Sequence, residues 1–273
     1  MAPFPHRVTL GRSGLEVSPL AVAGGYGVDR DSLLRAFDRG VNYWYHGSRR
    51  PSGMRDAVRA VKAAGHRDDL VLVLQSYSRI PSVMEATFTR GLKTLHLDYA
   101  DVLLLGWFDH GPSDAVLEGA ERMREKGLYK RLAISCHHRP TFVKYAKDTR
   151  YDILHVRYNA AHTGAEKDIF PHLSPDHRPG TVAYTATRWG QLTRSKLMPP
   201  GENPLRGRDC YRFVLSNPDF NVCMTGPKNA AEMDEALAAL DDGPLSPDEE
   251  ERVRRIGQHV RGASSVRSIV FGR

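Results

Sequence analysis

The sequence predicts an α/β fold, a (β/α)8 TIM barrel with an N-terminal β-hairpin and an extra C-terminal helix. Two observations carry this prediction. Short apolar stretches alternate with segments of helical spacing about eight times, the number of repeats that closes a (β/α) barrel. Some of the apolar stretches, such as residues 70–74, are uninterrupted, which is typical of parallel strands buried on both faces.

A single closed domain is favoured over the alternatives. The chain has 273 residues, and barrels of roughly 250 residues form one unit. Glycine and proline are spread over the loops without a linker-like tract, so residues 1–273 are expected to form one domain. A doubly wound open sheet fits less well, because no GxGxxG motif follows the first apolar strand.

The expected strands run from one end of the chain to the other. A β-prone hairpin at residues 7–18 comes first, with a glycine-containing turn at residues 11–14. Eight short apolar stretches follow it, each of a length suited to a barrel strand. They cover residues 20–23, 41–45, 70–74, 101–105, 131–134, 153–156, 181–185 and 220–224.

Helical spacing of apolar residues identifies the segments between the strands. In the first of them, Leu33, Leu34 and Phe37 share one face, and Gly40 ends the pattern. The same reasoning applies to the later segments. The predicted helices cover residues 31–39, 52–65, 81–95, 113–127, 140–147 and 230–240.

Capping residues support three helix starts. Ser52 and Ser113 each stand just before a helical pattern, where a serine oxygen can accept from a free backbone N–H. Residues Ser246-Pro247-Asp248-Glu249 form a capping box with proline at the first helical position. This box predicts the extra C-terminal helix outside the barrel repeat.

Charge and composition exclude several kinds of partner. The net charge is +7, but basic residues are mixed with acidic ones and are not interleaved with aromatic residues, so no nucleic acid is expected as a partner. A phosphate-bearing small ligand would suit this charge. No uncharged apolar run approaches the ~18 residues of a membrane span, and residues 1–6 lack an apolar signal core. We therefore expect no membrane partner and a cytoplasmic protein.

Cysteine and histidine usage gives no sign of a disulfide framework or a metal site. There are three cysteines and no CxxC motif, which argues against disulfides and a zinc ribbon. Several histidines and one cysteine follow predicted strands, but their spacing is not that of a known metal site. These residues are His46, His110, Cys136, His137 and His138. No metal is expected.

One strand end stands out by its chemistry. Tyr45 and His46 lie where a predicted strand ends, and Arg49 and Arg50 follow closely. Ligands bind outside the carboxyl ends of the strands in α/β proteins, so this segment is expected to be one wall of a pocket. Nearby arginines favour the phenolate and would lower the pKa of Tyr45, which makes Tyr45 the first candidate acid. His46 is the second candidate, since histidine titrates near neutrality. The alternative is that the aromatic residues 43–45 only fill the barrel.

Several segments resemble aldo-keto reductases, in the family's order and at similar spacing. The hairpin at residues 10–18 (LGRSGLEVS), residues 39–42 (RGVN), residues 97–105 (LDYADVLLL) and residues 183–185 (AYT) carry the resemblance. It covers nearly the whole chain. The resemblance implies a barrel that transfers a hydride between NADP(H) and a carbonyl or an alcohol.

The four catalytic positions of that family carry different residues in this sequence. Tyr45 stands where the family has aspartate, and the region 47–50 (GSRR) has no tyrosine where the family has its proton-donating one. Gln75 replaces the lysine, and Gly106 replaces the histidine. Reduction of a carbonyl develops an alkoxide that must be protonated or stabilised. The resemblance therefore implies a rebuilt active site, with Tyr45, His46 and Gln75 as the candidate catalytic residues and Tyr77 as a further candidate acid.

The cofactor side of the family pattern is kept in part. By resemblance, Ser135 lies near the nicotinamide amide, and Tyr184, with Thr185 beside it, stacks on the nicotinamide ring. His155 stands in place of the family's glutamine on the sixth strand. After the last strand the resemblance assigns cofactor contacts, including a 2′-phosphate site at a helix N-terminus. The residues of that region are Gly226, Lys228, Asn229 and Glu235.

Three functions are compatible with these residues. The first is an atypical NADP(H)-dependent oxidoreductase with a rebuilt active site. The second is a pseudoenzyme that binds a nucleotide or another ligand without turnover. The third is a non-redox lyase, isomerase or cyclase that uses Tyr45 and His46 as acid and base. The expected substrate is a small molecule, flat or aromatic, because an aromatic rim is predicted at the strand ends. This rim consists of Tyr26, Tyr45, Tyr77, Trp107, Phe108 and Trp189.

Overall fold

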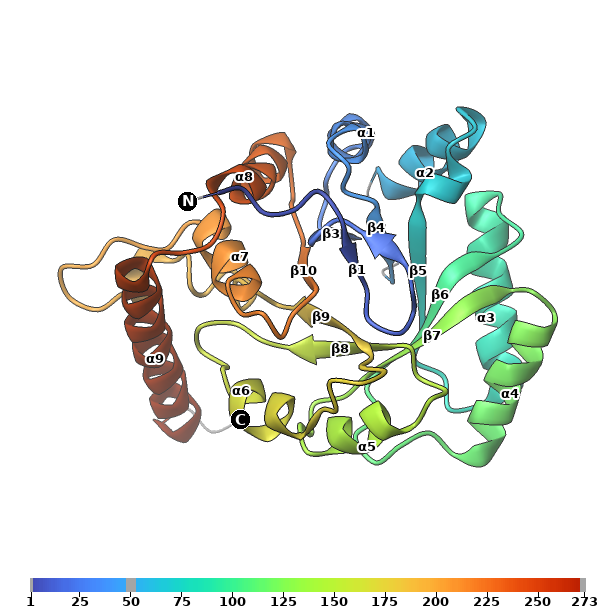
Figure 1. Cartoon of the computed structure of the whole chain (residues 1–273). Helices are drawn as coiled ribbons and strands as arrows, with labels where there is room; N and C mark the ends of the chain where they lie inside the picture. The colour runs from blue at the N-terminus through green and yellow to red at the C-terminus, as the bar shows by residue number, and fades with distance from the viewer. Residues whose placement is uncertain (1, 48–52, 271–273) are drawn as a thin grey trace.

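The computed structural model describes residues 2–47 and 53–270, and it gives only the backbone of residues 264–270. Eight parallel strands form a closed barrel (Figure 1). Pairing of the last strand with the first closes it, with Cys223 opposite Leu20. The barrel strands are β3 (Leu20–Gly24), β4 (Tyr43–His46), β5 (Val71–Ser76), β6 (Ala100–Leu105), β7 (Tyr129–Ser135), β8 (Ile153–Arg157), β9 (Gly180–Tyr184) and β10 (Val222–Thr225).

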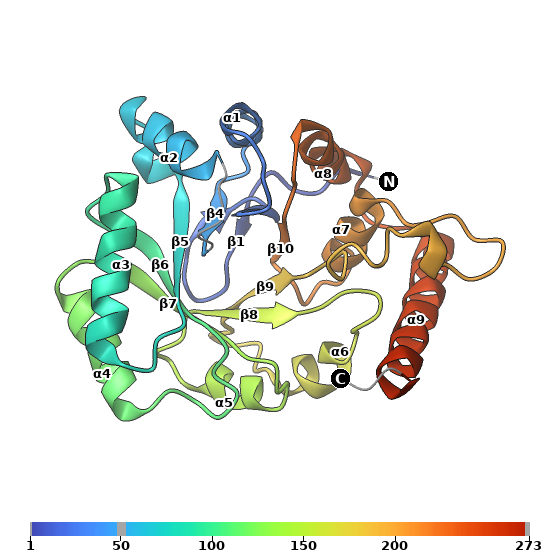
Figure 2. The ribbon, with the colours of Figure 1, turned by 180° about the vertical axis from the view of Figure 1, so that it is seen from behind.

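Helices surround this barrel, as the two opposite views show (Figures 1 and 2). Most follow a strand and return the chain to the start of the next one. They are α1 (Arg30–Asp38), α2 (Met54–Ala63), α3 (Pro81–Leu95), α4 (Asp114–Glu125), α5 (Thr141–Lys147), α6 (Ala165–Asp168), α7 (Gly207–Leu215), α8 (Ala230–Asp242) and α9 (Pro247–Val270), with short 3-10 turns η1 (Arg67–Asp69), η2 (Phe170–His172) and η3 (Ser195–Leu197). The predicted barrel, hairpin and C-terminal helix are confirmed; α6, α7 and the 3-10 turns were not predicted.

The N-terminal hairpin closes the amino-terminal end of the barrel. Strands β1 (Val8–Thr9) and β2 (Glu16–Val17) pair antiparallel. Leu10 and Val17 are fully buried and join the side chains of the barrel interior. The guanidinium of Arg12 donates to the carbonyl oxygens of Ala146 (2.9 Å) and Asp148 (2.7 Å) near the start of β8. The open end of the barrel is therefore the one at the carboxyl ends of the strands.

Side chains alternate between the barrel interior and the layer between strands and helices. Tyr43 packs in the interior, and Tyr45 packs against that interior cluster. Trp44 points the other way and is part of the larger core under the helices. The same alternation turns His46 away from the interior. The strand therefore offers Tyr45, and not His46, to anything bound in the barrel mouth.

Two of the three predicted helix caps lie within the described residues, and both are present. Ser113 caps α4 and accepts from the backbone N–H of Val116. At α9 the Ser246 N–H donates to a carboxylate oxygen of Glu249 (2.8 Å), and the Glu249 N–H donates to the Ser246 hydroxyl (3.2 Å). The predicted capping box is confirmed. Helix α2 begins after Gly53, and the predicted cap Ser52 lies outside the described residues.

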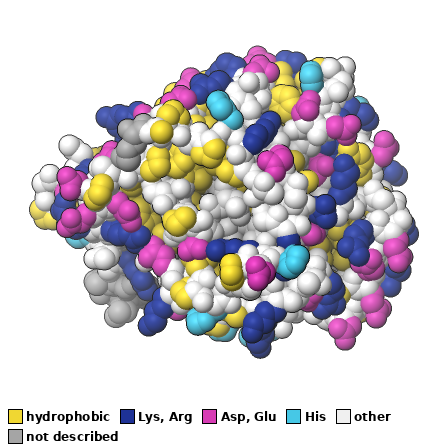
Figure 3. Space-filling view, in the orientation of Figure 1, with side chains coloured by type: hydrophobic (Ala, Val, Ile, Leu, Met, Phe, Trp, Pro, Cys, Tyr) yellow, Lys and Arg dark blue, Asp and Glu magenta, His cyan; other side chains and the backbone are white. Residues whose placement is uncertain are grey.

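The surface carries charges of both signs. Basic and acidic side chains are interspersed over the face drawn in Figure 3. Within residues 2–47 and 53–270, no helix is long and apolar enough to cross a membrane.

Candidate functional site

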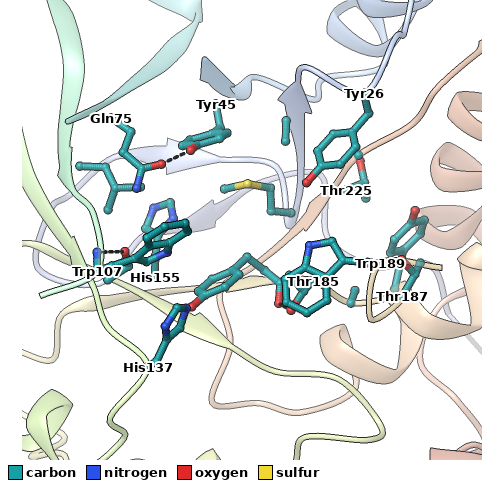
Figure 4. Close-up of a pocket in the computed structure, with 18 of the residues that line it drawn as sticks. Tyr26, Tyr45, Gln75, Trp107, His137, His155, Thr185, Thr187, Trp189 and Thr225 are labelled. Atoms are coloured by element: carbon teal, nitrogen blue, oxygen red, sulfur yellow. Dashed lines mark hydrogen bonds between the residues drawn. The ribbon is translucent and has the colours of Figure 1, made fainter. Parts of the chain in front are cut away.

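A cavity of about 220 Å³ opens at the carboxyl ends of the barrel strands. Figure 4 shows its lining side chains converging from several strands and from the loops that follow them. The lining is rich in aromatic and small polar side chains. It consists of Ala23, Tyr26, Tyr45, Gln75, Tyr77, Leu104, Trp107, Ser135, His137, His155, Tyr184, Thr185, Ala186, Thr187, Trp189, Tyr211, Met224, Thr225 and Gly226.

Tyr45 and Gln75 form the polar pair of the cavity. The Tyr45 hydroxyl donates to Oε1 of Gln75, and the two side chains face each other in Figure 4. Burial raises the pKa of Tyr45 far above its usual value, and the neighbouring Tyr77 raises it further. The expected lowering of the Tyr45 pKa was wrong, because the cavity removes water from the phenol. Arg49 and Arg50, on which that expectation depended, lie outside the described residues.

The side chains of Gln75 and Tyr77 occupy the space next to Gly106. A Cβ atom on Gly106 would lie 2.1 Å from Nε2 of Gln75 and 2.7 Å from Cδ1 of Tyr77. Both distances are far shorter than a van der Waals contact. The glycine is therefore required by the present packing, and a histidine at this position has no room.

His46 lies on the other face of β4 and does not line the cavity. Its Nδ1 is buried without a hydrogen-bond partner among the described residues. Burial lowers the pKa of His46, and the nearby Arg55 lowers it further. The sequence interpretation expected Tyr45 and His46 to act together on one ligand. Because the two side chains lie on opposite faces of β4, they cannot do so in the cavity.

Ser135 ends β7 and is held by the loop after β6. Its hydroxyl oxygen accepts from the backbone N–H of Trp107 at 3.2 Å, and its carbonyl oxygen accepts from the N–H of Phe108 at 2.9 Å. Trp107 adopts a left-handed backbone with φ of 57°. The Ser135 hydroxyl keeps its own proton available toward the cavity. Phe108 was expected in the aromatic rim but is buried outside the cavity.

The loop after β9 brings strained backbone to the cavity. Tyr184 ends the strand, and its hydroxyl is buried with no partner in the described part of the chain. Burial raises the pKa of this phenol. Thr185, Arg188 and Trp189 all have positive φ values, between 51° and 62°. Such angles cost energy in residues other than glycine, most of all in a β-branched threonine, and they cluster at functional sites.

A buried histidine lines the cavity and is hydrogen-bonded to a buried tyrosine. His155 is fully enclosed, and its Nε2 lies 2.9 Å from the hydroxyl of Tyr43. Burial lowers the pKa of His155 to about 3, so this imidazole is neutral at physiological pH. It offers a ligand a neutral polar group and no charge.

The loop after β10 places the remaining predicted cofactor residues. Gly226 lines the cavity, where the ring of Tyr26 packs against it. Asn229 caps α8 by accepting from the N–H of Glu232 at 2.9 Å. The Lys228 ammonium lies 3.5 Å from Glu232 and its side chain is 65% exposed. Lys228 and Asn229 are thus outside the cavity, at the start of α8, and each is already bonded to Glu232.

Glu235 lies farther along α8, beside the start of α7. A Cβ on Gly207 would lie 3.4 Å from its carboxylate oxygen. Glu235 does not line the cavity.

Some lining residues were not foreseen. Tyr211 comes from the unpredicted helix α7, Met224 comes from the interior face of β10, and Thr225 is the last residue of that strand. His137 follows Ser135 and packs against the Trp107 ring, with ring centroids 5.5 Å apart. The alternation of β10 was the one signal that could have found Met224. No group of three or more metal-ligating side chains forms within residues 2–47 and 53–270.

A closed eight-stranded parallel barrel with a cavity at this end defines a protein of the (β/α)8 ligand-binding class. Among solved structures, the chain is similar to the aldo-keto reductase AKR11C1 from Bacillus halodurans, in both its holo and apo forms. In each comparison the TM-score is 0.74 and the sequence identity 18%, and the match covers 92% of this chain and 95% of that chain. The chain has the aldo-keto reductase fold, as the sequence predicted. No family model and no curated protein matches it.

Proposed function

We propose that the protein is an atypical oxidoreductase of the aldo-keto reductase type, which uses NADP(H) and acts on a small, uncharged aromatic carbonyl or alcohol. One observation supports this more than any other. The Tyr45 hydroxyl, the Tyr184 ring and the Ser135 hydroxyl line one cavity, at the end of the barrel where such chemistry takes place.

The residues at the inner end of the cavity fit a nicotinamide. Tyr184 offers a ring face and a hydroxyl that lacks a partner among the described residues. Ser135 offers a hydroxyl proton for the carboxamide, because its oxygen already accepts from Trp107. Gly226 and Thr185 also line the cavity. A nicotinamide held there would supply or accept the hydride.

The residues at the outer end fit a 2′-phosphate after a local exchange of partners. Lys228 stands at the start of α8, where an anion is favoured by the helix dipole. Its present partner is Glu232, which is four residues away and exposed to solvent. Such surface pairs contribute about 0.3–0.5 kcal/mol, so a phosphate can replace the carboxylate at little cost.

Tyr45 is the group suited to the reacting oxygen of the substrate. Because burial raises its pKa, the phenol remains protonated at neutral pH and can donate to a carbonyl or alkoxide oxygen. Without a ligand this proton is donated to Oε1 of Gln75, so the hydroxyl turns from the amide oxygen to the substrate oxygen when it donates there. The positive charge of the family lysine is missing, so stabilisation of the oxyanion depends on hydrogen bonds alone.

The lining also argues for the class of substrate. Among the described residues, it contains aromatic side chains and no lysine, arginine, aspartate or glutamate. An ionised substrate would lose its hydration there without gaining a counter-ion. A neutral, flat molecule fits this surface best.

The test begins with the purified full chain and with binding. NADPH and NADH are titrated by calorimetry, and the oxidation of NADPH is then followed with a series of aromatic aldehydes. We expect Tyr45→Phe to lower kcat by about 10²- to 10⁴-fold without changing NADPH affinity. Tyr99→Phe is the matched control, since its hydroxyl bonds Asp68 outside the cavity. Lys228→Ala should weaken NADPH binding and leave NADH binding unchanged.

Two outcomes would reject parts of the proposal. If neither dinucleotide binds, the oxidoreductase assignment fails. If Tyr45→Phe turns over as fast as the parent protein, Tyr45 is not the proton donor.

A second function, ligand binding without turnover, is favoured by a cavity lining in which no described residue is a lysine, arginine, aspartate or glutamate. It predicts that NADPH binds and that no aldehyde in the series is reduced. The non-redox acid–base hypothesis has less support, because Tyr45 and His46 lie on opposite faces of β4.

A further inference from the structure

A group of cationic side chains gathers beside the cavity, around the loop between β8 and α6. It consists of Arg157 at the end of β8, His162 in the loop, Arg188 after β9 and Arg261 on α9, and it is called here the arginine cluster. None of its members lines the cavity described above.

Three segments of the chain contact one another at the arginine cluster: the loop after β8, the segment after β9 and helix α9. The side-chain amide of Asn159, in the loop after β8, donates to the carbonyl oxygen of Thr185 after β9 at 2.9 Å. Asn159 also forms an isolated bridge with His162. Helix α9 packs against the same loop so closely that a Cβ on Gly257 would lie 2.2 Å from the carbonyl oxygen of Ala160. Arg261 follows Gly257 by one helical turn, which brings it to the cluster.

Arg188 is the unusual member. The residue is only 8% exposed, and its Nη1 atom is buried without a hydrogen-bond partner in the described residues. Its backbone is held in a left-handed conformation, with φ of 52°. A guanidinium carries five N–H donors and normally enters a protein interior only when it is paired. The fold thus holds a charged group at a fixed place, with one nitrogen that has no acceptor among the described residues.

Neighbouring arginines add further positive charge around Arg188. Burial lowers the pKa of Arg188, and the nearby Arg261 and Arg157 lower it further. Burial and the same three arginines lower the pKa of His162 to about 4. The histidine is therefore neutral at pH 7, and the cluster keeps the charge of its arginines.

The nearest acidic side chains are bound to other partners. Asp168 accepts from Arg139 at 2.6 Å. Glu166 pairs with Arg254 at 2.9 Å and also accepts from the hydroxyl of Tyr158. Arg157 and Arg188 have no ion pair within residues 2–47 and 53–270, although other surface arginines of the chain are paired.

We propose that Arg157 and Arg188 bind a phosphate group, carried by inorganic phosphate or by a phosphate monoester, at a site separate from the cavity. Several guanidinium groups call for an anion with more than one charge and several acceptor oxygens. Phosphate matches the forked donors of arginine in two-point hydrogen bonds. Arg157, at the end of β8, and His162, in the loop, are only partly buried, so the edge of the cluster is open to solvent.

Binding of inorganic phosphate to the full chain tests the proposal. Calorimetry and the phosphorus NMR signal are followed at constant ionic strength, with chloride as the reference salt. We expect saturable binding to one site, which Arg188→Gln and Arg157→Gln each weaken about tenfold or more. Arg194→Gln is the matched control; it removes one exposed positive charge from the same loop and should leave phosphate affinity unchanged.

Stability separates a binding role from a structural one. Without phosphate, Arg188→Gln should unfold at the same or a higher urea concentration than the parent protein, because it removes a buried charge that lacks a partner. A loss of stability in phosphate-free buffer would mean that Arg188 is structural and would overturn the proposal. So would phosphate affinity that is equal in the parent protein and both arginine variants.

A competition experiment distinguishes the source of the phosphate. Inorganic phosphate is titrated into the parent protein saturated with NADPH. Unchanged affinity supports a separate site. Displacement of phosphate by NADPH would show that the cluster holds the phosphates of the dinucleotide, and the separate site would be rejected. If NADPH itself does not bind, the proposed function fails while the phosphate titration still gives its own answer.

Discussion

At the scale of single residues, the character of the cavity follows from how three side chains share the space at the ends of β5 and β6. Gly106 leaves room for the amide of Gln75 and the ring of Tyr77. Gln75 in turn receives the hydroxyl proton of Tyr45. The Gln75 amide, the Tyr45 phenol and the lack of a side chain at Gly106 therefore depend on one another. A change at any one of these positions would disturb the other two.

Gly106→Ala should reveal this dependence. The added methyl group overlaps Gln75 and Tyr77, so we expect a loss of about 1–3 kcal/mol in the free energy of unfolding, as for other overpacked sites. Gly91→Ala is the control, since its Cβ would meet Leu74 at an ordinary 3.6 Å within α3. That change should stabilise the protein by about 0.5–1 kcal/mol. Urea unfolding measures both, and equal effects of the two changes would contradict the packing argument.

Part of the candidate site could be predicted from the sequence at this scale. The strand-end residues Tyr45, Gln75, Ser135, Tyr184 and Gly226 do line one cavity, because all parallel strands of a barrel end on the same side. His46 was misplaced because a pattern of strand ends does not say which face the last residue takes. The pKa direction of Tyr45 was also wrong, since burial is a property of the whole cavity and not of its neighbours in sequence.

At the scale of elements, a helix with a strong local sequence pattern was predicted and a helix with a weak one was missed. Helix α3 was predicted with its observed bounds, Pro81–Leu95, since proline starts it and apolar residues repeat along one face. Helix α7 was missed. It begins after the long irregular segment 185–206, and its start depends on Arg206, whose N–H donates to Asp209 at 2.9 Å. Arginine is not among the residues preferred at a helix N-cap, so nothing in the sequence predicted this helix start.

Helices α7 and α9 are joined by an ion pair that no sequence pattern indicated. Arg212 on α7 is buried and donates twice to the carboxylate of Glu249, at 2.9 and 3.0 Å, in the first turn of α9. It also donates to the carbonyl oxygens of Gly243 and Pro244. These bonds fix the extra C-terminal helix against the barrel, and with it the position of Arg261.

Removing Glu249 should weaken this junction in a pH-dependent way. Hydrogen bonds from Arg212 and the Ser246 N–H lower the pKa of Glu249 to about 2. A depressed carboxyl pKa adds stability above the unfolded value of about 4.3, and that stability is lost as the pH falls toward 2. We expect Glu249→Gln to cost about 1–2 kcal/mol at pH 7, below the figure for a fully buried pair because Glu249 is 44% exposed.

Urea unfolding of the parent protein and the Glu249→Gln variant between pH 7 and pH 3 measures this difference. The gap should narrow steadily below about pH 4. Glu251→Gln, two residues farther along α9 and exposed, serves as the control and should match the parent protein at every pH. A gap that is constant with pH would show that the pair contributes through packing and not through charge.

At the scale of the whole molecule, the barrel was the most predictable feature, because eight repeats of the same pattern reinforce one another. The two proposed ligand sites were not equally easy to predict from the sequence. The cavity lies where every barrel of this class has its ligands, whereas the arginine cluster forms only when β8, β9 and α9 come together. Its members are 104 residues apart at the extremes, from Arg157 to Arg261, so no local pattern could have revealed it.

The separation of these sites can be tested through the stability of the folded chain. A ligand that binds only the folded state raises the free energy of unfolding by RT ln(1 + [L]/Kd), which is about 2.7 kcal/mol at one hundred times Kd. With NADPH and phosphate both present at that level, independent sites predict a sum of about 5 kcal/mol. In Arg188→Gln, with phosphate affinity weakened tenfold or more, the phosphate increment should fall to about 1.4 kcal/mol or below, and in Tyr184→Ala the NADPH increment should fall while the phosphate increment stays. Urea unfolding with each ligand and with both measures the increments. A combined increment of only about 3 kcal/mol, the value for two ligands that compete for one place, would contradict two independent sites.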